Sequence, residues 1–334
     1  MTTRILAFTK QGAVLAARLA GSLPEARLCC LPKFSAMGGE TVESLDVFTR
    51  SGWKQGEALL FVGAVGIAVR AIAPYIGSKM TDPAVVVVDE AGRFAISLLS
   101  GHMGGANDLA RAVAAAVGAE PVITTATDVR GKFAVDVFAK KNGLSITSIK
   151  LAKEVSAAIL AGERVGLFSA LPLDGIVPPE LALGAAQRLN LEIGFQAELP
   201  GSLLLIPKIA YLGLGCKKGA SASQIAAAAQ SALAACGVPG EAVAGAASID
   251  LKRDEPGLLR WADGLPLRFY SAAALRETPG EFTASAFVEQ TAGVDNVCER
   301  AAVLAAGMGQ LLQKKIAQNG ATAAVAVAEK RIML

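Results

Sequence analysis

Short apolar segments typical of β-strands alternate with helical segments near the start of the chain, and this alternation limits the possible folds more than any other feature. Residues 4–8, 58–63 and 121–125 have the character of buried strands, and residues 12–21 and 107–117 that of helices. Strands that alternate with helices are typical of a sheet covered by helices on both faces. The sequence therefore predicts a three-layer α/β/α domain.

One pair of predicted strands interrupts this alternation. Residues 84–89 (Ala-Val-Val-Val-Val-Asp) and 93–99 are both apolar, and the intervening segment 89–92 (Asp-Glu-Ala-Gly) favours a hairpin turn. The two strands of a hairpin are antiparallel. We therefore expect a mixed sheet in this domain.

The length of 334 residues and the distribution of patterns indicate more than one domain. The alternation weakens over residues 133–208, where three prolines within 171–180 mark a loop. After Pro207 the strand–turn–helix pattern begins again. We expect a multi-domain α/β protein with an N-terminal domain at 1–132, a variable middle region at 133–208 and a C-terminal domain at 209–334.

Composition excludes several classes of function. The net charge is only +3 and the basic residues are dispersed, whereas nucleic-acid-binding proteins usually have a basic face with stacking aromatic residues. The single histidine and five cysteines without a Cys-x-x-Cys pair predict no metal held by the protein. Unpaired cysteines and an N-terminus without a signal-peptide pattern point to reduced thiols and a cytoplasmic protein.

The most apolar long stretch, residues 58–77, is the best candidate for a membrane span. Arg70 and Pro74 interrupt it, and a charge near the centre of a span is costly. We interpret this stretch as a buried strand followed by a turn, and we expect no membrane contact.

The only histidine, His102, lies in a glycine-rich turn between a predicted strand and a predicted helix. Such a turn can present backbone N–H groups and the positive end of a helix dipole to an anion. Histidine is also the side chain whose ordinary pKa lies nearest neutrality. The alternative is structural: the glycines close a tight connection, and His102 donates a hydrogen bond to a backbone carbonyl. The candidate residues of this turn are Gly101, His102, Gly104, Gly105 and Asn107.

A second turn, residues 124–132, follows the predicted strand 121–125. In open α/β sheets ligands bind beyond the carboxyl ends of strands. The turn offers hydroxyl groups, one carboxylate and two cations, which suit a ligand bearing carboxylates or phosphates. The alternative is an N-cap at Asp128 with solvated threonines. Its candidate residues are Thr124, Thr125, Thr127, Asp128, Arg130 and Lys132.

Two further turns lie in the C-terminal region. Residues 213–221 contain Gly215, Lys217 and Lys218 ahead of a helix but lack the spacing of a phosphate-binding loop. The segment from Thr291 to Glu299 is another entry into a helix, for which simple capping is the alternative. No Gly-x-Ser-x-Gly elbow occurs, so a hydrolytic step here requires a base-activated water.

The blocks 63–74 and 79–89, with the histidine turn and Thr124 to Asp128, resemble the CbiG family. Residues 213–219 and 291–299 are similar to the C-terminal domain of that family, which CobE shares. Members of the CbiG family are cobalt-precorrin-5A hydrolases of the anaerobic cobalamin pathway. The resemblance implies opening of a δ-lactone on a cobalt corrinoid and release of acetaldehyde, which gives cobalt-precorrin-5B.

We assign roles for this reaction on chemical grounds. Lactone hydrolysis needs a general base and donors for an oxyanion. His102 is the predicted base, and Asp82, Asp89 and Asp128 are predicted to orient or replace it. The predicted contacts to the carboxylate-rich substrate are Arg70, Lys79, Gly101, Gly104, Gly105, Asn107, Thr124, Thr125, Thr127, Arg130, Lys132, Gly215, Lys217, Lys218, Thr291 and Glu299.

The resemblance implies no cofactor and no metal held by the protein, because cobalt arrives within the substrate. The implied partners are the corrinoid and the neighbouring methyltransferases of the pathway. Two alternatives stay open. One is a non-catalytic tetrapyrrole carrier, as the CobE-like half suggests, with His102 structural or an axial cobalt ligand. The other is an unrelated sugar- or nucleotide-binding protein, against which the missing phosphate motifs argue.

Overall fold

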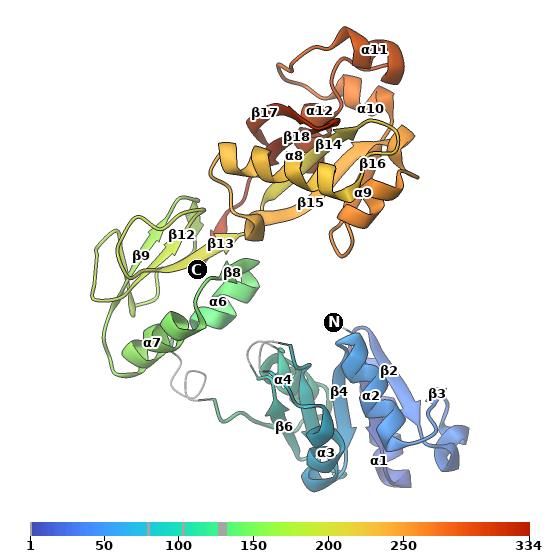
Figure 1. Ribbon diagram of the computed structural model, residues 1–334. Helices are drawn as coiled ribbons and strands as arrows, with labels where there is room; N and C mark the ends of the chain where they lie inside the picture. The colour runs from blue at the N-terminus through green and yellow to red at the C-terminus, as the bar shows by residue number, and fades with distance from the viewer. Residues whose placement is uncertain (1, 79–80, 102–103, 126–131) are drawn as a thin grey trace. The chain divides into compact units, whose positions relative to one another are not determined.

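The computed structural model describes residues 2–78, 81–101, 104–125 and 132–334 (Figure 1). Contacts divide the chain into two compact units, 1–137 and 138–334. The first unit contains a seven-stranded sheet, and the second contains two five-stranded sheets. The predicted mixed α/β class is confirmed.

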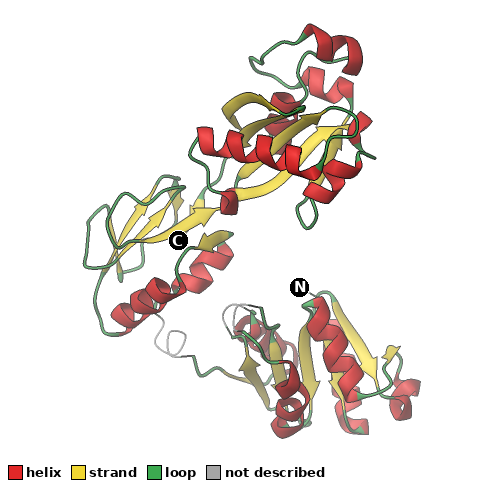
Figure 2. Ribbon diagram, viewed as in Figure 1, coloured by secondary structure: helices red, strands yellow, loops and turns green. Residues whose placement is uncertain are grey.

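The first sheet has the strand order β3-β2-β1-β4-β5-β6-β7. Helices α1 and α4 cover one face, where Leu19 and Val113 are buried, and helices α2 and α3 cover the other face. This is the predicted three-layer arrangement (Figure 2). The strands are β1 (Thr3–Ala7), β2 (Ala26–Cys30), β3 (Glu40–Thr41), β4 (Ala58–Val62), β5 (Val85–Val88), β6 (Phe94–Leu99) and β7 (Glu120–Val122), and the helices are α1 (Lys10–Ser22), α2 (Leu45–Gln55), α3 (Val65–Ile72) and α4 (Ala106–Val117).

The predicted hairpin is confirmed, and it reverses the direction of the sheet. Strands β1 to β5 run parallel, β6 pairs antiparallel with β5, and β7 runs parallel to β6. Leu99 at the end of β6 therefore lies opposite Val85 at the start of β5. The segments that follow β6 and β7 are at one end of the sheet, and the segments that follow β4 and β5 are at the other.

The interpretation of residues 58–77 as a strand followed by a turn is wrong in its second half. The strand β4 is followed by the helix α3 and a short 3₁₀ turn. The side chains of Ala68 and Ile72, four residues apart, are buried on one face of α3, while Val69 is exposed. This spacing is that of an amphipathic helix.

In the second unit, residues up to 207 form a sheet of order β11-β9-β12-β13-β8. The end of the chain returns to this region: β19 pairs with β10, and the Asn142 side chain hydrogen-bonds both the N–H and the carbonyl of Met333. The elements are α6 (Val135–Lys141), β8 (Leu144–Ile146), α7 (Ile149–Leu160), β9 (Val165–Ser169), β10 (Leu173–Asp174), β11 (Leu181–Leu183), β12 (Asn190–Ile193), β13 (Leu203–Pro207) and β19 (Ile332–Met333).

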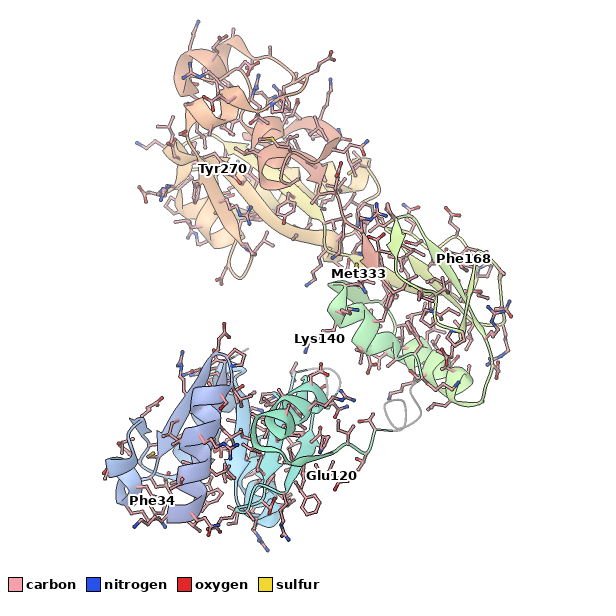
Figure 3. All side chains as sticks on the ribbon, turned by 180° about the vertical axis from the view of Figure 1, so that it is seen from behind. Phe34, Glu120, Lys140, Phe168, Tyr270 and Met333 are labelled. Carbon is pink, nitrogen blue, oxygen red and sulfur yellow. The ribbon has the colours of Figure 1, made fainter. Side chains whose placement is uncertain are left out.

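The last sheet has the order β16-β15-β14-β18-β17 and shares no strand with the others. Helices α8 and α9 pack on one face, and α10 and α12 pack on the other. Tyr270 at the end of β16 (labelled in Figure 3) packs with the α12 side. The elements are β14 (Ala210–Cys216), α8 (Ala222–Ala235), β15 (Val243–Ile249), α9 (Pro256–Trp261), β16 (Leu267–Tyr270), α10 (Ala272–Glu277), α11 (Ala286–Ala292), α12 (Cys298–Ala305), β17 (Gln310–Gln318) and β18 (Ala321–Val327), and the 3₁₀ helices of the chain are η1 (Pro32–Met37), η2 (Ala73–Tyr75), η3 (Gly240–Ala242) and η4 (Asp250–Lys252).

Helix α12 lies directly against the central strand β14 at Gly213. A Cβ atom at Gly213 would be 1.7 Å from the carbonyl oxygen of Cys298 and 2.5 Å from the backbone nitrogen of Ala302. Both atoms belong to the helix backbone, which cannot move aside as a flexible side chain does. Glycine is therefore required here for the helix to reach the sheet.

We predict that Gly213→Ala destabilises the C-terminal domain by about 1–3 kcal/mol or more, because the added methyl group overpacks the contact between α12 and β14. Gly240→Ala is the matched control, because nothing lies within 4 Å of a Cβ there, and it should stay within about 0.5 kcal/mol of wild type. Urea denaturation in a Trp53→Phe background measures this loss of stability through the fluorescence of Trp261, which packs against the core of that domain. Equal midpoints for the two variants would contradict the prediction.

Candidate functional site

A cavity of about 850 Å³ opens at the carboxyl ends of the parallel strands β14 and β15. The loops that follow these strands, the turn between β17 and β18, and the segment from 285 to 298 form its walls. This is the end of an α/β sheet at which ligands usually bind. Of the predicted residues, Gly215, Lys217, Lys218 and Thr291 line the cavity.

Two backbone contacts fix the loop that carries Lys217 and Lys218. The N–H of Lys217 donates to the carbonyl of Gly320 at 2.9 Å, which joins the loop to the turn between β17 and β18. The N–H of Gly219, a residue with a φ of 78°, donates to the carboxylate of Glu255 at 2.7 Å. Lys252 also donates to this carboxylate, at 3.2 Å. The two lysines therefore project from a loop that is held from both sides.

The cavity is electropositive. Four lysines line it, and Asp295 is the one acidic residue among its lining residues that the structure describes. Arg300 donates to both oxygens of Asp295, at 2.8 and 3.1 Å, so this carboxylate is already neutralised. The Arg300 guanidinium is the main cause that lowers the pKa of Asp295 below its ordinary value. A cavity lined in this way attracts anions. The lysines are Lys217, Lys218, Lys252 and Lys315.

Two large apolar side chains stand exposed in the wall of the cavity. Phe287 on α11 is 73% exposed and Leu251 is 67% exposed. Helix α11 buries none of its residues, and Figure 1 shows it at the outer end of this domain. The cavity thus combines cations with uncovered apolar surface.

Glu299, a predicted substrate contact, does not line the cavity and holds its walls together. Its side chain is fully buried at the start of α12. One oxygen accepts the N–H of Thr283 at 2.9 Å, and the other accepts the N–H of Lys315 at 2.8 Å. Glu299 thereby ties the segment ahead of α11 to strand β17.

The two cysteines of the cavity are poor nucleophiles. Burial raises the pKa of the Cys216 thiol, and it raises the pKa of the Cys298 thiol to about 11. Both thiols are therefore protonated near neutral pH, whereas the thiolate is the reactive form. Within the described residues, no group of three or more His, Cys, Asp or Glu side chains is placed to hold a metal ion.

In the first unit, Asn107 organises the turn that follows β6. Its side chain is buried, accepts the hydroxyl of Ser97 at 2.6 Å and donates to the hydroxyl of Thr125 at 3.2 Å. Its N–H donates to the carbonyl of Gly101 at 3.0 Å. A Cβ at Gly101 would lie 2.6 Å from the Asn107 amide oxygen. Two of the predicted segments, at 101–107 and 124–125, thus meet at Asn107.

Gly104 and Gly105 shape the same turn. A Cβ at Gly104 would lie 2.4 Å from the Cβ of Ser100, and Gly105 has a φ of 88° where it precedes α4. Asp82, on the approach to β5, is at the same end of the sheet because β6 runs antiparallel to β5. Its carboxylate accepts the N–H groups of Gly77 and Ser78 and so stabilises its own turn.

Asp89 lies at the opposite end of the first sheet from the glycine turn, so it does not join that turn as predicted. Arg70 lies on helix α3, where its guanidinium donates to the carbonyl of Gly66 at 3.4 Å. Asp89 follows β5 directly, and its carboxylate accepts the N–H groups of Arg93 at 2.6 Å and Phe94 at 2.7 Å. Burial acts to raise the pKa of Asp89, but these hydrogen bonds and the Arg93 guanidinium hold it below its ordinary value. Asp89 thus closes the hairpin turn.

The remaining predicted residues are exposed or undescribed. Thr124 and Lys132 are exposed. His102, Lys79, Thr127, Asp128 and Arg130 lie outside the described residues, and their assignments stay predictions. None of the helices that the structure describes is long and apolar enough to cross a membrane.

Three family models match successive parts of the chain. "Cobalamin synthesis G N-terminal" matches residues 47–128, "Cobalamin biosynthesis central region" matches 133–193, and "Cobalamin synthesis G C-terminus" matches 210–326. The cobalt-precorrin-5A hydrolase of Salmonella typhimurium is 35% identical over 97% of both chains. The chain belongs to the CbiG family.

Two other relatives support this assignment. The cobalt-precorrin-5A hydrolase of Priestia megaterium is 31% identical over 97% of this chain and 94% of its own. Protein CobE of a Sinorhizobium species is 37% identical over 36% of this chain and 84% of its own. The whole cavity falls within the part that matches the CbiG C-terminal model.

The sequence reasoning missed three residues of this CbiG cavity: Lys252, Lys315 and Phe287. Lys252 lies just beyond the carboxyl end of β15, where ligands bind in open α/β sheets, so the same rule that led to the other turns points to it. Lys315 lies on β17, an edge strand with many polar residues that gave no clear strand pattern. An isolated phenylalanine carries no signal in the sequence that distinguishes an exposed position from a buried one.

We predict a pH dependence from Glu255. The hydrogen bond from the Gly219 N–H is the main cause that lowers its pKa below the ordinary 4.5, and Lys252 adds to it. A carboxylate with a lowered pKa in the folded state stabilises the protein in full above pH 4.5, and this stability is lost as the pH falls through the folded pKa.

Between pH 7 and pH 3, the melting temperature of Glu255→Gln should therefore fall less steeply as the pH is lowered than that of wild type. The matched control is Glu241→Gln, at an exposed glutamate of the same domain, which should follow the wild-type profile. A Glu255→Gln profile parallel to wild type would show that this hydrogen bond contributes nothing to acid sensitivity.

Proposed function

We propose that this member of the CbiG family is a cobalt-precorrin-5A hydrolase, which opens the δ-lactone of its substrate, releases acetaldehyde and yields cobalt-precorrin-5B. The observation that carries the proposal is the 35% identity to a cobalt-precorrin-5A hydrolase over 97% of both chains. The electropositive cavity supports it, because the substrate carries acetate and propionate side chains.

The reaction requires little redox chemistry from the protein. Water adds to the lactone carbonyl, the acyl C–O bond breaks, and a carboxylate and an alcohol result. The alcohol then loses its proton as its carbon separates from the macrocycle as acetaldehyde. The electron pair of the broken C–C bond stays on the cobalt macrocycle, which is part of the substrate, so the protein itself mainly binds and positions.

We assign the activation of water to the glycine turn of the first unit. His102 is the proposed base, and the backbone N–H groups of Gly104 and Gly105 are the proposed donors to the oxyanion. The hydrogen bonds of Asn107 support this role because they hold the turn against Ser97 and Thr125. Asp128 is the alternative base, because the carboxylates of Asp82 and Asp89 each accept backbone N–H groups of the turns that they stabilise.

We propose that the protein needs no cofactor of its own and acts in the cytoplasm, beside the methyltransferases of the same pathway. The first point follows from the proposed reaction, in which cobalt enters with the substrate.

The decisive test is anaerobic incubation of the purified protein with cobalt-precorrin-5A. We expect one acetaldehyde per corrinoid consumed, together with the mass of the lactone-opened product. Cobalt-precorrin-5A recovered unchanged, while a known hydrolase converts the same batch, would favour a non-catalytic carrier. The resemblance to CobE and the location of the cavity within the C-terminal match are the observations that favour this second function.

We predict that His102→Asn lowers turnover by about 10²–10⁴-fold, because asparagine keeps some hydrogen bonding but cannot act as the base. Histidine is the side chain whose ordinary pKa lies nearest neutrality, which suits it to accept a proton. Corrinoid affinity should change little, which separates this result from a binding defect. Preserved turnover with a lower melting temperature would identify His102 as structural, and a shifted corrinoid absorption spectrum would identify it as a cobalt ligand.

A further inference from the structure

We propose that the C-terminal cavity is the subsite that anchors the peripheral carboxylates of a corrinoid, and that Phe287 packs on the face of its macrocycle. The inference deepens the proposed function, on which it rests for the choice of ligand. It moves the recognition of the substrate's charges to Lys217, Lys218 and Lys315, and it assigns a role to helix α11.

Some charged side chains of the cavity have an ion-pair partner, and others do not. Asp295 is paired with Arg300, and Lys252 is paired with Glu255. No acidic side chain among the described residues lies within ion-pair distance of Lys217, Lys218 or Lys315. These three lysines come from two separate elements, the loop after β14 and strand β17, yet they line one cavity. A ligand with several carboxylates spread around its periphery matches such an arrangement.

Backbone hydrogen bonds hold the main chain of Lys217 and of Lys315 in place without a ligand. The loop of Lys217 is joined to Gly320, and the backbone of Lys315 is bonded to the buried carboxylate of Glu299. Preorganised cations lose less conformational freedom when they bind an anion, which favours affinity.

The apolar part of the cavity points to a ring. Phe287 is 73% exposed and lines the cavity from a helix that buries none of its residues. Leu251 is exposed in the loop after β15 and lines the same cavity. A ligand that is flat and apolar in its centre and anionic at its edge would cover both side chains and meet the lysines. Simple anions such as phosphate would leave the apolar surface uncovered.

The experiment measures binding to the full chain by isothermal titration calorimetry. The probes are cobyrinic acid, whose side chains are free carboxylic acids, and cobinamide, in which they are amidated. We expect cobyrinic acid to bind more tightly than cobinamide. The combined variant Lys217→Gln, Lys218→Gln and Lys315→Gln should weaken cobyrinic acid binding by about tenfold or more, because each partly exposed ion pair contributes modestly.

The control for the lysines is a lysine of the same strand, and the control for Phe287 is another exposed apolar side chain outside the cavity. Lys314→Gln, on the neighbouring position of β17 outside the cavity lining, should change the dissociation constant less than about twofold. Phe287→Ala should weaken both probes by about fivefold, as expected for one lost aromatic contact. Ile176→Ala, at a side chain that is 91% exposed outside the cavity, should have no effect on either.

A second measurement needs no variant. Raising the salt concentration should weaken the binding of cobyrinic acid by wild type and leave cobinamide largely unaffected, because exposed charge pairs are screened. Equal affinity of wild type and the triple-lysine variant for cobyrinic acid, or no binding of either probe by wild type, would overturn the inference.

The outcome is separable from that of the proposed reaction. The expected binding pattern without acetaldehyde release would reject the hydrolase and retain the subsite. Acetaldehyde release with no effect of the lysine substitutions on binding would retain the hydrolase and reject the subsite.

Discussion

The C-terminal domain depends on the contact between α12 and β14 at Gly213. Because the carbonyl of Cys298 occupies the space that a side chain at this position would need, the helix backbone rests on the central strand. The start of α12 thereby comes to the carboxyl end of β14, where Cys298 lines the cavity and Glu299 is buried beneath it. The cavity is a direct consequence of this close approach.

Glu299, at the start of the same helix, connects α12 to two walls of the cavity. A buried carboxylate is costly unless its oxygens are hydrogen-bonded, and both oxygens of Glu299 accept backbone N–H groups. The two donors belong to the segment ahead of α11 and to β17. The wall that carries Phe287 and the strand that carries Lys315 are therefore fixed by one side chain.

The sequence was informative wherever a pattern is local. The hairpin at 84–99 was predicted from β-branched runs and a short turn, and the turn at 213–221 was correctly placed between a strand and a helix. The hairpin also fixes the direction of β6 relative to β5, and this direction decides which turns share one end of the sheet. Asp89 is predicted to orient or replace His102, yet the reversal places it at the other end of the sheet from the glycine turn. Contacts such as that between Glu299 and Lys315 join distant segments, and no local sequence pattern predicts them.

The position of Glu299 shows what residue type alone leaves open. A glutamate at the start of a helix has the same sequence signature whether it binds a ligand or supports the fold. The difference lies in the burial of its side chain and in the donors that reach it, which depend on Gly213 permitting α12 to pack against the sheet. The lysines of the cavity are the opposite case: Lys217 and Lys218 are exposed, while the backbones of Lys217 and Lys315 are held by Gly320 and Glu299. In this site a buried glutamate therefore holds the cavity walls together, and the lysines remain available to an anionic ligand.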